Sequence, residues 1–212
     1  MKTGILFDLD GTLLDTLADI HTAVNHSLTL WGYPERTLEE VRRFVGNGAK
    51  RLFDLAVPQG ADPRPALEEF QRWYPSHCEA QTGPYEGIPE ALAVLQARYP
   101  VAIVSNKPDP AVKPLCGKYF PGIFAIGESA DCPRKPAPDM VRKAMDALGV
   151  DRCIYVGDSE VDVLTAHNAG VPCVSVLWGF RTQQEIAPYG ESVFCESPHQ
   201  LPHIIEELLH GK

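Results

Sequence analysis

Short apolar runs that end in polar residues alternate with amphipathic stretches along most of the chain after residue 85. An uninterrupted apolar run predicts a strand that is buried on both faces, as in a parallel sheet. The stretches between the runs place apolar residues at helical spacing, with Pro near the start. This alternation predicts an α/β fold with a doubly wound, Rossmann-like parallel sheet, whose ligands bind beyond the carboxyl ends of its strands. The predicted strands are residues 4–10, 101–104, 123–126, 154–156 and 171–177, and the predicted helices are residues 89–99 and 138–148.

Residues 16–83 show a different pattern, with helical spacing and no convincing strand. Thr37 and Glu40 form a capping box that opens one of the predicted helices. We therefore expect a small all-helical domain at residues 16–83, inserted into a core formed by residues 1–15 and 84–212. A turn at Gly83-Pro84 is expected where the chain returns to that core. The apolar positions that support these helices are Ile20, Val24, Leu28, Trp31, Leu52, Leu55, Leu67, Phe70 and Tyr74.

Composition narrows the range of partners. The chain has 212 residues and a formal net charge of −9, and an acidic surface disfavours nucleic acids and anionic membranes. Three apolar residues precede Asp8, whereas a signal peptide needs about seven or more and a membrane span about 20. We therefore expect a soluble, cytoplasmic protein. The six cysteines show no C-x-x-C spacing, which predicts reduced, buried thiols.

The first predicted strand ends in Asp8-Leu9-Asp10-Gly11. Residues i and i+2 of a strand lie on one face, about 7 Å apart, so the spacing predicts that both carboxylates share a face. Burying two like charges is costly unless a cation neutralises them. Carboxylate oxygens with open positions suit Mg²⁺. The alternative at this point is a solvated Asp-Gly turn.

Three further polar motifs follow, or closely trail, other apolar runs. Ser105-Asn106-Lys107 comes directly after the run at 101–104, and Gly157-Asp158-Ser159 comes after the run at 154–156. Lys135 lies between these motifs, in a rigid Lys-Pro-Ala-Pro segment that precedes a predicted helix. A doubly wound sheet gathers such loops at one edge, which favours a shared site over four unrelated loops.

These motifs resemble, in order and in spacing, the four motifs of the haloacid dehalogenase-like hydrolase superfamily, and the similarity extends over essentially the whole chain. The matching segments are D-x-D-G-T at residues 8–12, Ser105-Asn106, the lysine of K-P-x-P at Lys135, and G-D-S-x-x-D at residues 157–162. Residues 45–49, 105–108 and 178–181 further resemble the phosphoglycolate phosphatase branch, whose members carry a helical cap domain.

The resemblance implies a role for each matching residue. Asp8 would be the nucleophile that forms an aspartyl-phosphate, and Asp10 would protonate the leaving oxygen and then activate water. Mg²⁺ would be held by Asp8, the carbonyl of Asp10 and Asp158. Ser159 and Asp162 would hold these ligands in place without binding the ion. Residues implied to contact the phosphoryl group or the rest of the substrate are Gly11, Thr12, Asn47, Gly48, Ser105, Asn106, Lys107 and Lys135.

The expected function is therefore a Mg²⁺-dependent phosphomonoester hydrolase for a small anionic metabolite similar to 2-phosphoglycolate. Asp10 favours a phosphatase or a phosphomutase over a dehalogenase, since halide leaves without protonation. A pyrophosphatase and a sugar-phosphate phosphomutase remain alternatives. A signalling module that is phosphorylated on aspartate is a further alternative from another class, although such modules are about half as long and lack a helical insertion. The resemblance allows a monomer or a homodimer.

Overall fold

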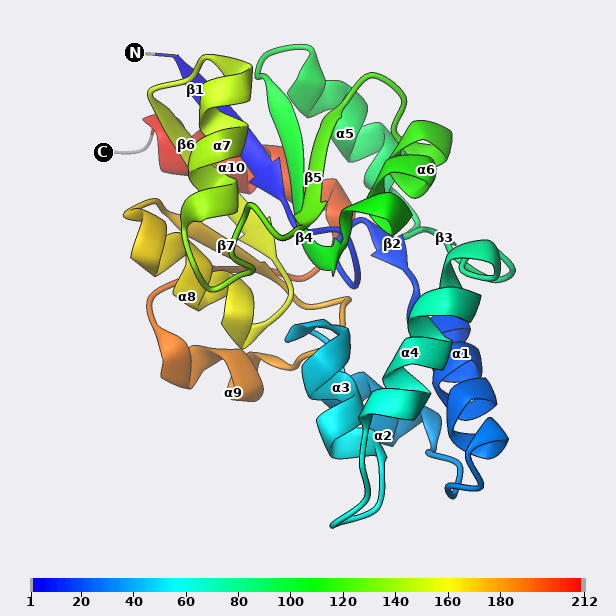
Figure 1. Cartoon of the computed structure of the whole chain (residues 1–212). Helices are drawn as coiled ribbons and strands as arrows, with labels where there is room; N and C mark the ends of the chain where they lie inside the picture. The colour runs from blue at the N-terminus through cyan, green and yellow to red at the C-terminus, as the bar shows by residue number, and fades with distance from the viewer. Residues whose placement is uncertain (1, 211–212) are drawn as a thin grey trace.

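A computed structural model describes residues 2–210 of the chain, and its core is a six-stranded parallel sheet (Figure 1). The strand order β5-β4-β1-β6-β7-β8 places β1 in the interior and confirms the doubly wound α/β fold. Each interior strand is a run of apolar residues because both of its faces are covered. The strands are β1 (Thr3–Phe7), β4 (Val101–Pro108), β5 (Phe124–Glu128), β6 (Arg152–Gly157), β7 (Cys173–Val176) and β8 (Val193–Cys195).

Alternate residues of each strand enter two separate hydrophobic clusters, one on each face of the sheet. Ile5, Phe7 and Ile103 belong to one cluster, and Leu6 and Ala102 belong to the other. The first face is covered by α5 (Ile88–Gln96), α6 (Asp109–Tyr119) and α10 (Leu201–His210). The second is covered by α7 (Asp139–Leu148) and α8 (Glu160–Ala169), with the short α9 (Gln183–Ile186) beside them.

The segment between β2 (Leu14–Asp15) and β3 (Gly83–Pro84) is helical, and we call it the helical insert. It contains α1 (Leu17–Leu30), α2 (Leu38–Phe44), α3 (Gly48–Ala56), α4 (Arg64–Trp73) and the 3₁₀ turn η1 (Tyr74–Ser76). Both ends of the insert are tied together, since β2 and β3 pair antiparallel. In Figure 1 the insert is the blue and cyan group of helices set apart from the sheet. The predicted capping box of Thr37 and Glu40 is present at the start of α2.

The sequence-based boundaries needed several corrections. β1 ends at Phe7 rather than at residue 10, because the chain bends into a loop once its backbone bond from Asp8 N to Val156 O has been made. Gly83-Pro84 forms a strand rather than a turn. Trp31 is half exposed just beyond α1 and contributes little to the core of the insert. The edge strand β8 and the helices α6 and α10 were not predicted. Within residues 2–210 the structure contains no helix with the length and apolarity that crossing a membrane requires.

Candidate active site

Asp8 lies at the carboxyl end of β1, in the middle of the sheet, and its side chain is held in one orientation. Its Oδ1 atom accepts a hydrogen bond of 2.7 Å from the Leu9 amide and one of 2.8 Å from Lys135 Nζ. Burial raises the pKa of the Asp8 carboxyl well above its usual range, although Lys135 acts in the opposite direction. A buried carboxylate with a fixed cation beside it and an open cleft before it is suited to nucleophilic attack.

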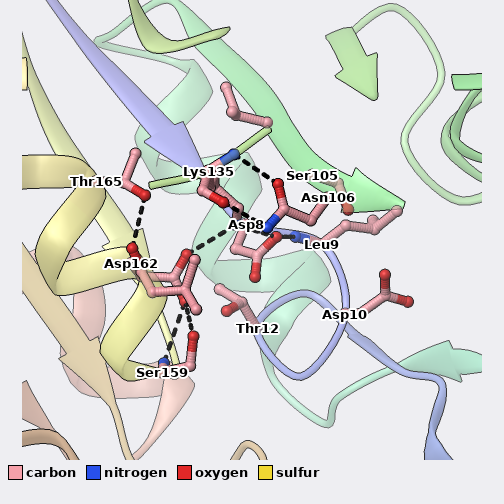
Figure 2. A network of polar contacts seen from close by, with 12 residues as sticks. Asp8, Leu9, Asp10, Thr12, Ser105, Asn106, Lys135, Ser159, Asp162 and Thr165 are labelled. Carbon is pink, nitrogen blue, oxygen red and sulfur yellow. Dashed lines mark hydrogen bonds and ion pairs between the residues drawn. The ribbon is translucent and has the colours of Figure 1, made fainter. Parts of the chain in front are cut away.

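Lys135 comes from the loop before α7 and is wholly buried beneath Asp8. Asn106 fixes its backbone twice, because Asn106 Oδ1 accepts from Lys135 N at 2.7 Å and Asn106 Nδ2 donates to Lys135 O at 3.1 Å. The ammonium contacts Asp8 Oδ1 and Asp162 Oδ1, both at 2.8 Å (Figure 2). Burial lowers the pKa of Lys135, but the two carboxylates outweigh burial and raise it well above its usual value. Lys135 therefore stays charged.

Asp158 and Asp162 bring two more carboxylates to the same place. Together with Asp8 they offer three oxygens that lie within 4.8 Å of one another. Asp162 caps α8, accepting from the Ser159 amide at 3.1 Å and the Ser159 hydroxyl at 2.7 Å. Burial, and then the charge of Asp162, raises the pKa of Asp158 to about 7. The three carboxylates and Lys135 carry a formal charge of −2, which a divalent cation among these oxygens would balance.

The loops around Asp158 approach so closely that they require glycine. A Cβ atom on Gly11, whose φ is +83°, would lie 2.3 Å from Asp158 Oδ2, and one on Gly179 would lie 2.5 Å from the same oxygen. The absence of side chains lets the Phe180 amide donate to Asp158 Oδ2 at 2.7 Å. Thr12 also donates to Asp158, from Oγ1 to Oδ1 at 3.3 Å.

Asp10 does not share a face with Asp8, which corrects the prediction made from their spacing. The strand has already ended at Phe7, so the alternation of side chains in a strand does not extend to Asp8 and Asp10. Figure 2 shows Asp10 turned away from Asp8 and Asp162. The Asp10 carboxylate instead pairs with Lys107, from Oδ1 to Nζ at 2.7 Å. The same ammonium donates to the Tyr74 hydroxyl at 2.7 Å.

The helical insert reaches the site through a second group of contacts. Arg181 donates to the carbonyls of Arg42 at 2.8 Å and Val45 at 2.8 Å, at the end of α2. Its Nε also pairs with Glu160 at 3.1 Å. Asn106 Nδ2 donates to Gly46 O at 3.1 Å. The structure therefore shows the insert docked against the loops that carry the acidic cluster.

A pocket lies between the insert and the carboxyl ends of the strands. Its wall from the core is mostly polar, and its wall from the insert is mostly apolar, with Ile20, Leu52 and Phe70. Asn47, Gly11, Thr12, Lys135 and Asp162 are not among its lining residues. Asn47 is the N-cap of α3, and its Nδ2 atom lies 3.5 Å from Glu160 Oε1. The other four residues are buried. The predicted site residues that do line the pocket are Asp8, Asp10, Gly48, Ser105, Asn106, Lys107, Asp158 and Ser159.

Two residues of the site were missed as functional candidates. Helical spacing predicts that Tyr74 belongs to the insert's core, and nothing in the sequence pairs it with Lys107, which lies 33 positions away. Arg181 belongs to the motif at residues 178–181, but its partners at the end of α2 are about 140 residues away. A lone Arg after a Gly-Phe pair was the available signal for Arg181.

With this geometry in place, comparison with known proteins identifies the family. Residues 5–176 match the family model of haloacid dehalogenase-like hydrolases. The chain belongs to this family, as the four motifs predicted.

Similar proteins then place the chain within the family. A phosphoglycolate phosphatase from Rhodobacter capsulatus is 36% identical over 217 residues, covering 97% of this chain and 98% of the relative. One from Xanthomonas campestris pv. campestris is 36% identical over 207 residues, covering 93% and 94%. The solved structure of a candidate phosphoglycolate phosphatase from Lactobacillus delbrueckii subsp. bulgaricus is 34% identical, covers 100% of both chains and superposes with a TM-score of 0.90. The chain is a phosphatase of the phosphoglycolate phosphatase-like branch.

Proposed function

We propose that the protein is a Mg²⁺-dependent phosphomonoester hydrolase that acts on a small anionic metabolite similar to 2-phosphoglycolate, through an aspartyl-phosphate on Asp8. One observation carries the proposal. Asp8 stands at the end of β1 with Lys135 2.8 Å away and with Asp158 and Asp162 beside it, and the pocket before it also receives Asp10. A nucleophile, a cation, candidate metal ligands and a proton donor thus converge on one cleft.

The donor set fits a hard divalent cation. Carboxylate oxygens are the ligands that Mg²⁺ prefers, and it is usually bound by one or two carboxylates together with substrate phosphate. We assign Asp8, Asp158 and the backbone carbonyl of Asp10 as ligands. Asp162 already accepts hydrogen bonds from Lys135 and Ser159, so we assign it to hold the ligands in place and not to bind the ion itself. When bound, such an ion neutralises charge on the phosphoryl oxygens and offsets the repulsion among the carboxylates.

In the first step the Asp8 carboxylate attacks phosphorus and the bond from phosphorus to the leaving oxygen breaks. The step requires Asp10 in its protonated form, which gives that oxygen its proton, so the product leaves as an alcohol and Asp8 becomes an aspartyl-phosphate. The phosphoryl oxygens are bound by the Ser105 hydroxyl and the backbone N–H of Asn106, which lie toward the carboxyl end of β4. Lys135 supplies positive charge beside Asp8.

In the second step Asp10, now a carboxylate, takes a proton from a water molecule as the water oxygen attacks phosphorus. The bond from phosphorus to Asp8 breaks, inorganic phosphate leaves, and the Asp8 carboxylate is restored.

We further propose that the helical insert, taken as residues 16–83, is a cap domain over a core of residues 1–15 and 84–212. Its docked residues form one wall of the pocket before Asp8, and closer approach of this wall would exclude bulk water during the first transfer. The pocket has a volume of about 70 Å³, which favours a substrate of few atoms beyond the phosphoryl group. The proposed 2-phosphoglycolate-like substrate also follows the names of the relatives.

Phosphate release from 2-phosphoglycolate tests the proposal, with pyrophosphate hydrolysis and isomerisation of a sugar phosphate measured in parallel. We expect 2-phosphoglycolate to be the preferred substrate, no activity with EDTA and restored activity with Mg²⁺. Asp8→Asn should abolish turnover while the protein keeps its fold by circular dichroism. Preference for pyrophosphate or for isomerisation would select an alternative, and a phospho-Asp8 that persists far beyond a turnover time would favour the signalling module. The cytoplasmic location and the monomeric or homodimeric state stay predictions.

A further inference from the structure

Lys107 forms the second buried ion pair of the site, and its partners come from both parts of the molecule. Its Nζ atom lies 2.7 Å from Asp10 Oδ1 and 2.7 Å from the Tyr74 hydroxyl oxygen. The ammonium also lies 4.7 Å from the centre of the Tyr74 ring. The Lys107 side chain is 4% exposed and that of Asp10 is 14% exposed. The contact therefore forms away from bulk water, where a charged hydrogen bond is strong.

Each of the two residues is held from its own side. Lys107 extends from β4, and its amide donates to Ser105 Oγ at 3.1 Å, so its backbone is fixed by the phosphate-binding strand end. Tyr74 begins η1 and stacks on Phe70 with ring centres 4.8 Å apart. Phe70 packs in turn against Phe53 of α3. The position of the Tyr74 hydroxyl is therefore set by the packing of the helical insert.

We infer that Lys107 and Tyr74 are positioning residues for Asp10, and that docking of the helical insert completes the proton-transfer half of the active site. This inference rests on the proposed function, because it assigns the acid–base step to Asp10. Lys107 fixes the rotation of the Asp10 carboxylate, and Tyr74 fixes Lys107 and covers it from solvent. If the insert moves away, Tyr74 leaves with it, and the Lys107–Asp10 pair becomes hydrated and less fixed.

The inference differs from the role that the sequence suggested for Lys107, which was contact with the substrate or its phosphate. A phosphate ligand would need its ammonium free to reach the phosphoryl oxygens beside Ser105 and Asp8. In the structure that ammonium is committed to Asp10 and Tyr74, whereas Lys135 is the lysine that contacts Asp8. The two roles predict different effects on inhibition by inorganic phosphate.

Leaving-group dependence provides the sharpest test. An alkyl phosphate such as 2-phosphoglycolate needs a proton on its leaving oxygen, whereas p-nitrophenyl phosphate releases a stable anion and needs little help from Asp10. For each substrate kcat/KM reports the first transfer to Asp8. We expect Lys107→Met to lower kcat/KM for the alkyl phosphate by about 100-fold, the scale of misplacing a general acid. Tyr74→Phe should lower it by about 10-fold, the scale of one hydrogen bond to a charged group.

One matched control lies away from the pocket, and a second keeps the charge of Lys107. Tyr119→Phe also removes a tyrosine hydroxyl, which donates to Thr82 O at 2.7 Å, and should leave both substrates unaffected. Lys107→Arg keeps the charge and should restore part of the activity toward the alkyl phosphate. Thermal unfolding and circular dichroism of each variant establish that it is folded. A substrate series of phenyl phosphates with graded leaving groups replaces p-nitrophenyl phosphate if the latter is a poor substrate.

The inference predicts that Lys107→Met and Tyr74→Phe lose far less with p-nitrophenyl phosphate, by about 3-fold or less, and that the inhibition constant of inorganic phosphate stays unchanged. Equal losses with both leaving groups, no loss with either, or weaker inhibition by phosphate in Lys107→Met would overturn it. Each of these results leaves the proposed function standing. That function fails separately if Asp8→Asn retains turnover.

Discussion

Two buried lysines divide the active site into halves that are built differently. Every ionic partner of Lys135 comes from the core, since Asp8 follows β1 and Asp162 lies on α8. Lys107 instead joins Asp10 of the core to Tyr74 of the helical insert. The proposed nucleophile Asp8 is therefore paired with a cation that the core itself supplies. The proposed acid–base half also takes a partner from the docked insert.

Replacement of each lysine by methionine tests this comparison most severely, through the free energy of unfolding. Lys135→Met leaves Asp8 and Asp162 as buried carboxylates without their cation. The free energy of unfolding should fall by about 3–5 kcal/mol, and activity should fall by at least about 1000-fold. Lys107→Met should cost less stability, because Lys107 neutralises one carboxylate that is 14% exposed, whereas Lys135 neutralises two carboxylates, one of which is fully buried. Urea unfolding measures both. Lys143→Met, which removes a surface contact with Asp131 O, serves as the control. Equal losses in the free energy of unfolding for Lys107→Met and Lys135→Met would contradict this difference between the two halves.

Binding of Mg²⁺ should stabilise the part of the site around Asp8, and the size of this stabilisation should depend on pH. The pKa of Asp158 is raised to about 7 in the folded protein, whereas the pKa of an aspartate in an unfolded chain is about 4. Between these values the folded state holds a proton that the unfolded state has lost, so metal-free stability falls as the pH rises from about 4 to about 7. Mg²⁺ should therefore raise Tm by several degrees at about pH 8 and by less at about pH 5.5. Thermal scans with EDTA or Mg²⁺ test this, and a larger effect at the lower pH would contradict it.

Weakening the docking of the insert should also impair activity, by less than loss of either buried lysine. Arg181→Ala removes hydrogen bonds to the carbonyls at the end of α2. We expect KM to rise by about 10-fold, with faster hydrogen exchange at residues 45–48, because the docked state is less populated. Arg181→Lys should be intermediate. Arg98→Ala, which removes an exposed pair with Glu206, should change neither property. Unchanged exchange in Arg181→Ala would show that these contacts do not hold the insert.

The sequence was sufficient to predict the half of the site that depends on the sheet. A buried strand followed by Asp8, and another followed by Asp158, determine where both side chains lie once parallel strands are assumed. The helix that begins after Ser159 was not among the predicted helices, although it opens with a capping box of Ser159 and Asp162. Local rules of this kind operate over a few residues, so they can be applied without knowing the rest of the fold.

The other half could not be predicted because it depends on tertiary contacts. The orientation of Asp10 is set by a loop and by an ion pair with a residue 97 positions away. The contact of Tyr74 with Lys107 depends on how the insert docks, and helical spacing assigned Tyr74 to the insert's core, where it is indeed buried. The same spacing misplaced Trp31, because periodicity continued past the point where α1 ends. Patterns of apolar residues report burial, but they do not report which neighbour a polar atom will meet.

The central claim is that Asp8 becomes covalently phosphorylated during turnover, and a rapid acid quench tests it directly. The protein is mixed with excess 2-phosphoglycolate and Mg²⁺, quenched within the first turnover, digested and analysed by mass spectrometry. We predict a phosphorylated peptide in which the modified residue is Asp8, absent in Asp8→Asn and lost with hydroxylamine, which cleaves acyl phosphates. Product formation in the first turnover without phosphate on Asp8, or with phosphate on another residue, would contradict the account.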